Sequence, residues 1–209
     1  MSEFRAVIFD LGGVVIDSPL HTIAAYERDL GIPDGFVNRL VVETGPTGAW
    51  SRLERGEIDR ATFERDFDAE CQAGGHPLSA REMMRRISEC APRPSMLRAI
   101  DRLRAADFLV AALTNNWVDE SAPANTPHEF SARFHVVIES AKTGLRKPDP
   151  RIYELACQEL GVQPHEAVFL DDIGRNLKTA RALGMRTIKV DAPEPALAAL
   201  TELVGIDLS

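Results

Sequence analysis

AVIFDLGGVVID, residues 6–17, is the stretch around which the rest of this chain is organised. Its first residues form a short apolar, partly β-branched run, which is typical of a buried strand. The run ends at the carboxylate of Asp10, and the glycines Gly12 and Gly13 follow, where the backbone can take positive φ angles and approach a ligand closely. Open α/β sheets bind ligands at the carboxyl ends of parallel strands. The stretch alone is equally compatible with a functional aspartate and with an ordinary surface turn.

The composition restricts the class of protein. The chain has 209 residues, of which 44% are hydrophobic, enough for one well-packed core with a small insertion. Its net charge of -8 argues against a nucleic-acid partner, because binding a phosphate backbone requires clustered cations. Three distant cysteines without metal-site spacing favour a reducing, cytoplasmic setting. No apolar stretch approaches the ~20 residues of a membrane span, so we expect no membrane partner.

The periodicity changes after residue 17. Residues 18–92 show helical patterns without strand patterns, which predicts an all-helical cap whose aromatic and methionine positions form its own core. Ser79 is expected to cap the last of these helices. From residue 93 onward helix and strand patterns alternate, which predicts a parallel sheet covered by helices on both faces. The predicted fold is therefore an α/β, three-layer core of residues 1–17 and 93–209 with a helical cap of residues 18–92.

Within the second core segment, strands are expected over residues 108–113, 136–138, 168–170 and 187–190. Ser95 and Asp149 are expected to cap the helices that follow them. The segment from Ser121 to Ser131, rich in Pro, Asn and Ser, is predicted to be a loop.

Polar residues follow several predicted strands that lie far apart in the sequence. In a parallel sheet all carboxyl ends lie on one edge, so these groups can converge there. Each residue alone could be a helix cap, a strand-end hydroxyl or a solvated cation, but their arrival at one edge by chance is improbable. The residues are Asp10, Thr114, Asn115, Lys147, Asp171, Asp172 and Asn176.

This set of side chains has a consistent chemistry. Neighbouring carboxylates cannot all stay ionised without a cation, which makes Mg²⁺ the natural partner of Asp10 and Asp172. Thr114 offers a hydroxyl and backbone N–H groups to phosphate oxygens. Lys147 offers a point charge that would neutralise both a phosphoryl group and an attacking carboxylate. The pattern predicts a magnesium site that accepts a small phosphate ester.

Four motifs, FDLGGV, LTNN, RKPDP and FLDDIGRN, resemble those of the haloacid dehalogenase superfamily in order and spacing. The runs RPSMLRA, LTNNW, KPDPRIYEL and FLDDIGRNLKTAR look most similar to the amino-terminal phosphatase domain of soluble epoxide hydrolases and to the related domain fused to some acyl-CoA dehydrogenases. The resemblance implies a Rossmann-like core with a helical cap, and hydrolysis of phosphomonoesters through an aspartyl-phosphate.

The resemblance also implies a role for each matching residue. Asp10 would be the nucleophile, oriented by Lys147, and Asn176 would support the site. The substrate would contact Thr114, Asn115, Gly12 and Gly13. The ligands of Mg²⁺ would be Asp10, the carbonyl of Gly12, Asp171 and Asp172.

The chain departs from the family's phosphatases at one position. Those enzymes usually carry a second aspartate two residues after the nucleophile, where this chain has Gly12. General acid–base catalysis contributes about 10²- to 10⁴-fold, so the change matters. Asp17 is a nearby carboxylate that could substitute. The cap is expected to select the substrate through side chains near Leu20, Trp50 and Met84.

Three hypotheses follow. The first is a Mg²⁺-dependent phosphatase, weakened by Gly12 or favouring good leaving groups. The second is a 2-haloacid dehalogenase, which needs neither that acid nor a metal. The fourth motif of that branch resembles Ser-Ser-Asn, however, where this chain has Asp171 and Asp172. The third is a non-catalytic domain that binds a phosphorylated ligand or a partner.

Overall fold

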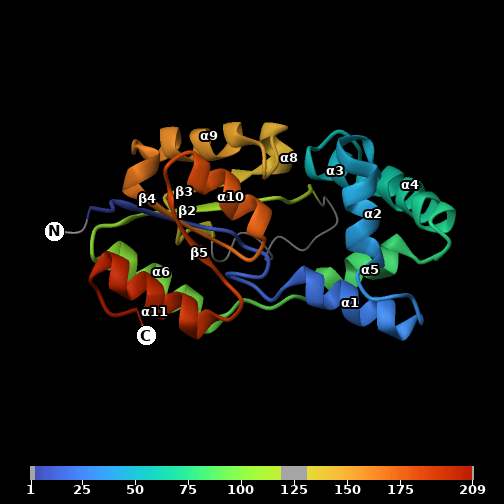
Figure 1. The fold of residues 1–209 in the computed structure, drawn as a ribbon, viewed down its shortest axis with the longest axis horizontal. Helices are drawn as coiled ribbons and strands as arrows, with labels where there is room; N and C mark the ends of the chain where they lie inside the picture. Colours follow the sequence, from blue (N-terminus) through green and yellow to red (C-terminus); the bar gives the residue numbers. More distant parts are fainter. Residues whose placement is uncertain (1–2, 119–130, 209) are drawn as a thin grey trace.

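The computed structural model describes residues 3–118 and 131–208, so the loop predicted over residues 121–131 falls almost entirely outside the described residues. A five-stranded parallel sheet of order β3-β2-β1-β4-β5 lies at its centre (Figure 1). The strands are β1 (Ala6–Phe9), β2 (Leu109–Thr114), β3 (Val136–Glu139), β4 (Ala167–Asp171) and β5 (Arg186–Lys189). Because β1 pairs with both β2 and β4, the chain leaves the middle of the sheet at Asp10.

Helices cover both faces of the sheet (Figure 1). One face packs against α6 (Pro94–Ala105) and α11 (Pro193–Val204), the other against α9 (Pro150–Leu160) and α10 (Gly174–Ala182). The short helices α8 (Ser140–Thr143) and η2 (Pro164–Glu166) lie in the connections. Successive strand side chains point to opposite faces, so Val7 and Phe9 enter one core while Ala6 and Ile8 enter the other. The predicted three-layer α/β architecture is confirmed.

Residues 18–92, the segment predicted to be the cap, contain five α-helices and one 3₁₀ turn. They are α1 (Pro19–Asp29), α2 (Phe36–Thr44), η1 (Gly45–Thr47), α3 (Ala49–Glu54), α4 (Arg60–Ala73) and α5 (Ala80–Ile87). The cap has its own hydrophobic core, as the sequence predicted, and its fully buried members include Phe63, Phe67, Met83 and Met84. Across residues 3–118 and 131–208, none of the helices is both long and apolar enough to cross a membrane.

Two chain segments join the cap to the core, and they run beside each other. Ile16 forms a bridge with Pro92, and the Arg93 N–H donates to the carbonyl of Val15 at 2.8 Å. The same arginine donates from its guanidinium to the carbonyl of Gly13 at 2.8 Å. The loop after β1 is therefore fixed where the cap begins.

Two of the three helix caps that the sequence predicts are present in the structure. Asp149 and Ser79 each accept a backbone N–H from the first turn of α9 and α5, which confirms both predicted caps. The cap predicted at Ser95 is wrong. Helix α6 begins one residue earlier, at Pro94, and Arg93 is its N-cap. Proline suits the first helical position because its missing N–H would have no partner there.

Candidate functional site

The side chains of Asp10, Lys147 and Asp171 meet at the carboxyl edge of the sheet. Asp10 follows β1, Asp171 ends the neighbouring β4, and Lys147 lies in the loop between α8 and α9. The Nζ atom of Lys147 lies 2.8 Å from Oδ1 of Asp10 and 2.8 Å from Oδ2 of Asp171. The three side chains are at most 9% exposed. A buried ammonium thus bridges two carboxylates that the sequence separates widely.

Asp171 holds its surroundings in place. Its Oδ1 accepts the N–H of Ile173 at 2.7 Å, and Nδ2 of Asn176 lies within 3.1 Å of both carboxylate oxygens. The Tyr153 hydroxyl donates to the carbonyl of Asn176 at 3.1 Å. Donors therefore occupy both oxygens of Asp171, which favours an anchoring role for this residue and a supporting role for Asn176.

Three carboxylates offer a position for a metal ion. One oxygen each from Asp10, Asp171 and Asp172 lie within 4.8 Å of one another, and Oδ2 of Asp172 accepts the Ser18 hydroxyl at 3.4 Å. Gly13 has a φ of +78°, and a Cβ there would lie 2.1 Å from Oδ2 of Asp172, so this close approach requires glycine. Three carboxylates around one ammonium leave an excess of negative charge, which fits a hard divalent cation such as Mg²⁺.

The pKa values reflect the same excess of negative charge. Burial raises the pKa of Asp10 well above its ordinary value; the Lys147 charge opposes this, and Asp171 and Asp172 reinforce it. Burial and then repulsion from Asp171 also raise the pKa of Asp172. Burial would lower the pKa of Lys147, but the two carboxylates beside it outweigh burial and raise it. Lys147 stays charged, and a bound cation would favour the ionised carboxylates.

Thr114 and Asn115 reach the same edge from β2. Thr114 is buried and lines the cavity described below. The Asn115 side chain forms two hydrogen bonds with the backbone of Lys147. Its Oδ1 accepts the Lys147 N–H at 2.8 Å, and its Nδ2 donates to the Lys147 carbonyl at 3.1 Å. Asn115 therefore has a structural contact in addition to its predicted contact with substrate.

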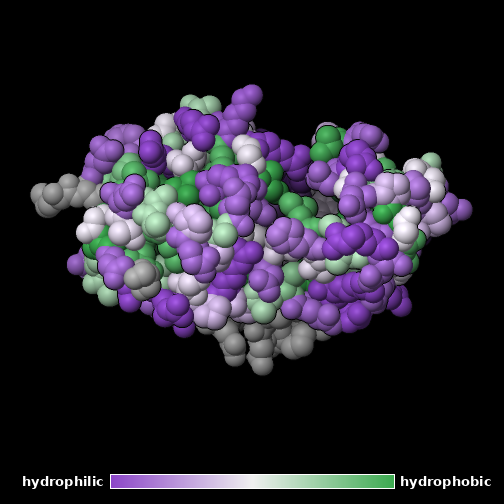
Figure 2. All heavy atoms as spheres, turned by 60° about the horizontal axis from the view of Figure 1, so that its bottom comes forward, coloured by the Kyte–Doolittle hydropathy of each residue, from purple (hydrophilic) through white to green (hydrophobic). Residues whose placement is uncertain are grey.

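A cavity of about 280 Å³ lies between this edge and the cap. In the space-filling view the surface is hollowed between the larger lobe and the cap, with hydrophobic side chains beside the hollow (Figure 2). The edge of the sheet contributes the polar side chains of Asp10, Thr114, Lys147 and Asp172 and the backbone of Gly12, and the cap contributes those of Glu27, Asn38 and Glu54. The apolar lining consists of Pro19, Leu20, Ile23, Ala24, Val37, Val41, Trp50, Trp117 and Ile173.

Two sequence-based expectations about this cavity are corrected. Met84 does not line the cavity, because it is fully buried in the core of the cap. Asp17, considered as a substitute acid, is also absent from the lining and lies 3.6 Å from the Arg93 guanidinium. Leu20 and Trp50 do line the cavity, as expected.

Glu54 and Arg146 are lining residues that the sequence did not indicate as partners. The Arg146 Nε donates to Oε2 of Glu54 at 2.6 Å, although the residues are 92 positions apart. Arg146 belongs to the RKPDP motif, which signals its nearness to Lys147. Glu54 belongs to a cap helix without a motif, so only the packing of cap on core reveals this pair.

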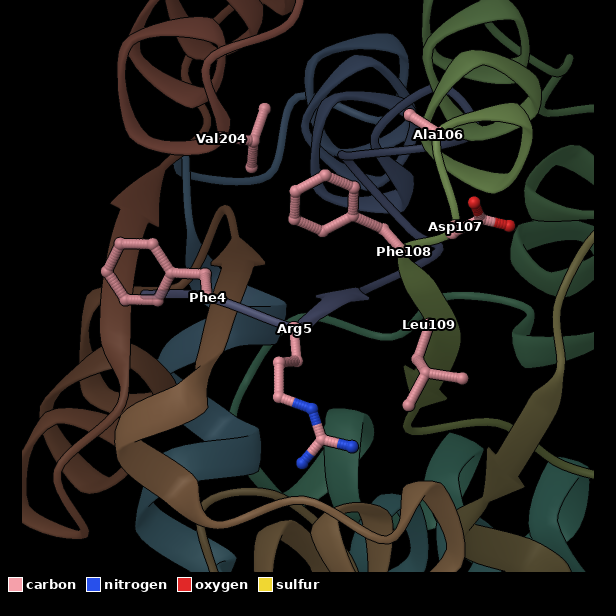
Figure 3. A pocket seen from close by; sticks show the side chains of 7 residues that line it. All are labelled: Phe4, Arg5, Ala106, Asp107, Phe108, Leu109 and Val204. Carbon is pink, nitrogen blue, oxygen red and sulfur yellow. The ribbon is translucent and has the colours of Figure 1, made fainter. Parts of the chain in front are cut away.

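A second cavity, of about 450 Å³, lies at the opposite, amino-terminal edge of the sheet (Figure 3). Its one cationic side chain, Arg5, pairs with Glu166 at 3.1 Å. The strand ends that carry the polar cluster are at the other edge, so this cavity is not part of the site. Its lining residues are Phe4, Arg5, Ala106, Asp107, Phe108, Leu109 and Val204.

Comparison with known proteins identifies relatives over nearly the whole chain. The chain is 39% identical over 210 residues to acyl-CoA dehydrogenase family member 10 from Mus musculus, covering 99% of this chain and 20% of that protein. It is 35% identical over 218 residues to bifunctional epoxide hydrolase 2 from Sus scrofa, covering 98% of this chain and 39% of that protein. The chain thus spans only a minor part of these two relatives.

A relative of similar length is sesquiterpene phosphatase astK from Aspergillus oryzae, 26% identical over 206 residues, with 98% of each chain covered. Among solved structures, a predicted HAD-like hydrolase from Porphyromonas gingivalis has a TM-score of 0.69 at 23% identity, covering 97% of this chain and 98% of that one. This structural likeness concerns the fold. A family model described as haloacid dehalogenase-like hydrolase matches residues 4–184. The chain belongs to the haloacid dehalogenase-like hydrolase family.

Proposed function

We propose that this protein is a Mg²⁺-dependent phosphatase that hydrolyses small phosphomonoesters through an aspartyl-phosphate on Asp10. The observation that carries the proposal is the position of the Lys147 ammonium, 2.8 Å from both Asp10 and Asp171. This charge favours the ionised form of Asp10 and would offset the charge of an incoming phosphoryl group. Asp10 can then act as the nucleophile of a covalent mechanism.

The contacts of Asp10 suggest which oxygen attacks. Its Oδ1 accepts the N–H of Leu11 at 2.7 Å and lies 2.8 Å from Nζ of Lys147, so we assign Oδ2 as the nucleophile. Oδ2 forms a bond to phosphorus while the bond from phosphorus to the ester oxygen breaks. The electron pair stays on that oxygen, which takes a proton from water. A second water attacks phosphorus and gives its proton to solvent while the bond between phosphorus and Oδ2 breaks, which releases inorganic phosphate and the Asp10 carboxylate.

The remaining residues bind the reacting groups. Thr114, Asn115 and Gly13 would contact phosphate oxygens through hydroxyl and backbone N–H groups. Mg²⁺ would be held by Asp10, Asp172 and the carbonyl of Gly12, with Asp171 as their anchor. When bound, the ion would supply positive charge to the phosphoryl oxygens.

The cavity favours a phosphate ester with an apolar alcohol part. Its cap side is lined mainly by aliphatic and tryptophan side chains, among them Ile23, Val41 and Trp50, and the polar side chains of Glu27, Asn38 and Glu54 also line it. The A. oryzae relative is named a sesquiterpene phosphatase, which agrees with an apolar substrate. Since Gly12 provides no acid, esters with a stable leaving group, such as aryl phosphates, should react best.

The free cysteines Cys71, Cys90 and Cys157 are consistent with a cytoplasmic location.

Hydrolysis of p-nitrophenyl phosphate tests the proposal. We expect colour release that requires Mg²⁺, stops in EDTA and is absent in Asp10→Asn. Asp17→Asn is a matched control, because Asp17 belongs to the same stretch but its carboxylate is 60% exposed and pairs with Arg93. Release that persists in EDTA or in Asp10→Asn would contradict the mechanism.

A 2-haloacid dehalogenase is the second candidate, favoured by the glycine at position 12. The acidic pair Asp171 and Asp172 speaks against it, because that chemistry needs no metal. Halide release from 2-chloropropionate in the presence of EDTA would reverse the ranking. Binding of phosphate esters without turnover of either substrate class would instead favour the non-catalytic hypothesis.

A further inference from the structure

Glu54 is a cap side chain that makes contact with the core. It ends α3, is only 7% exposed and lines the cavity. Its Oε2 accepts Nε of Arg146 at 2.6 Å, and its Oε1 accepts the indole N–H of Trp50 at 2.9 Å. Arg146 also donates to the Ser51 hydroxyl at 3.2 Å. The end of α3 is therefore fastened to the loop that carries the catalytic lysine.

The same carboxylate oxygen also accepts a hydrogen bond from Asn115. Nδ2 of Asn115 lies 3.4 Å from Oε2 of Glu54 and 3.1 Å from the carbonyl of Lys147. Oδ1 of Asn115 accepts the N–H of Lys147 at 2.8 Å. Asn115 thus forms hydrogen bonds with both the N–H and the carbonyl of Lys147. Arg146 directly precedes Lys147 in the chain. Glu54 therefore contacts both Asn115, which is hydrogen-bonded to the Lys147 backbone, and Arg146, which is covalently linked to it.

We propose that Glu54 is a positioning residue: by holding Arg146 and Asn115 it fixes the Lys147 backbone, and with it the ammonium between Asp10 and Asp171. The effect on turnover rests on the phosphatase function proposed above, whereas the effect on the Lys147 backbone does not. Because Glu54 belongs to the cap, the lysine is fully positioned only while the cap contacts the core. Chemistry at Asp10 is thereby coupled to a closed cavity.

A simple attachment of cap to core would behave differently. Loss of such an ion pair would lower the stability of the fold and leave both the Lys147 backbone and the turnover of the folded protein unchanged. A direct catalytic role for the Glu54 carboxylate is disfavoured, because both of its oxygens already accept hydrogen bonds from Arg146 and Trp50.

Hydrogen exchange at the Lys147 amide, measured on the whole chain without substrate, tests the positioning role. Glu54→Gln keeps the side-chain size and removes the charge. Glu57→Gln is the matched control, since Glu57 is also a cap glutamate paired with an arginine, at 2.6 Å from Nε of Arg55, but its side chain is 48% exposed. We expect the Lys147 amide to exchange about tenfold faster in Glu54→Gln, because a charge-assisted contact is lost, and at the wild-type rate in the control.

Kinetics with p-nitrophenyl phosphate in saturating Mg²⁺ provides the second readout. We expect kcat of Glu54→Gln to fall about tenfold or more with a smaller change in KM, since the lysine geometry affects the transition state more than ground-state binding. Arg146→Gln should have a similar effect. The double variant should lose no more than the worse single variant, because both substitutions break one contact.

Unchanged Lys147 exchange in folded Glu54→Gln, equal changes in Glu57→Gln, or faster exchange with unchanged kcat would overturn the proposal. Should Glu54→Gln fail to fold, the same comparison with Arg146→Gln decides. Absence of phosphatase activity in the wild type would refute the proposed function, and the exchange measurement would still decide whether Glu54 holds the Lys147 backbone.

Discussion

The ammonium of Lys147 lies 2.8 Å from the carboxylate of Asp10, and both side chains are buried although they come from opposite halves of the chain. A second carboxylate, that of Asp171, lies equally close to the same ammonium. One buried cation therefore pairs with two carboxylates. The effects of removing the Lys147 charge and of adding Mg²⁺ beside it can both be measured.

Removal of the Lys147 charge should destabilise the protein. Lys147→Met leaves Asp10 and Asp171 buried without their cation, and breaking a buried ion pair in this way costs about 3–5 kcal/mol. We expect a decrease of that order in the free energy of unfolding, measured by urea denaturation in EDTA, together with loss of phosphatase activity. Lys142→Met is the control, because Lys142 is 65% exposed in its pair with Glu139 and should matter little. Equal stabilities of the two variants would contradict the importance of the buried ammonium.

Addition of Mg²⁺ should stabilise the folded chain. An ion that binds only the native state at 100 times its Kd adds about 2.7 kcal/mol to the free energy of unfolding. We expect the thermal unfolding midpoint of the wild type to rise with Mg²⁺ concentration and to fall back to its Mg²⁺-free value in EDTA. In Asp172→Asn, Mg²⁺ should raise the midpoint only slightly. Asp191→Asn, at a carboxylate that is 82% exposed, should respond like the wild type. An undiminished Mg²⁺ response in Asp172→Asn would argue against ligation by Asp172.

Restoration of an acid at position 12 should raise turnover only if space is made for it. A Cβ at Gly12 would lie 3.2 Å from both Cγ and Cδ of Pro19, so Gly12→Asp alone is crowded. Combining it with Pro19→Ala removes those ring atoms at the first residue of α1. We expect the double variant to hydrolyse p-nitrophenyl phosphate up to about 10²-fold faster than Pro19→Ala, the lower end of general acid–base effects.

The leaving group provides the control for that experiment. Across a series of aryl phosphates, the wild-type rate should depend strongly on the acidity of the released phenol, and the dependence should weaken in the double variant. A well-folded double variant with neither a faster rate nor a weaker dependence would show that proton transfer at position 12 does not limit turnover.

Alkaline pH should destabilise the chain through two buried thiols. Burial, with smaller contributions from Asp68 and Glu70, raises the pKa of Cys71 to about 12, and burial raises that of Cys157 to about 11. Between an ordinary thiol pKa of about 8.5 and these values, the unfolded chain has lost protons that the folded chain retains. The free energy of unfolding therefore decreases as pH rises, by up to about 1.4 kcal/mol per pH unit for each thiol.

Denaturation between pH 8 and pH 11 measures this slope. Cys71→Ala should reduce the slope, because the Cys71 proton then no longer differs between the folded and unfolded states. The same slope in Cys71→Ala and the wild type would mean that the Cys71 thiol does not contribute.

Local sequence was sufficient for the architecture and for the central cluster. Helix and strand periodicities are set by which side chains face the core, so they can be recognised in the sequence itself. Asp10 and Asp171 were predicted to be neighbours because the carboxyl ends of parallel strands share one edge. That prediction needed only the strands and their direction.

The contacts between cap and core depended on the folded arrangement. Glu54 meets Arg146 across 92 positions, and no periodicity specifies how a helical insertion docks on a sheet. Asp17, at the junction of core and cap, lies beside Arg93 and not in the cavity, which its position in the sequence did not reveal. Strand ends converge by a general rule of parallel sheets, whereas the partner of a cap side chain is selected by the packing of particular surfaces, which exists only once both lobes are formed.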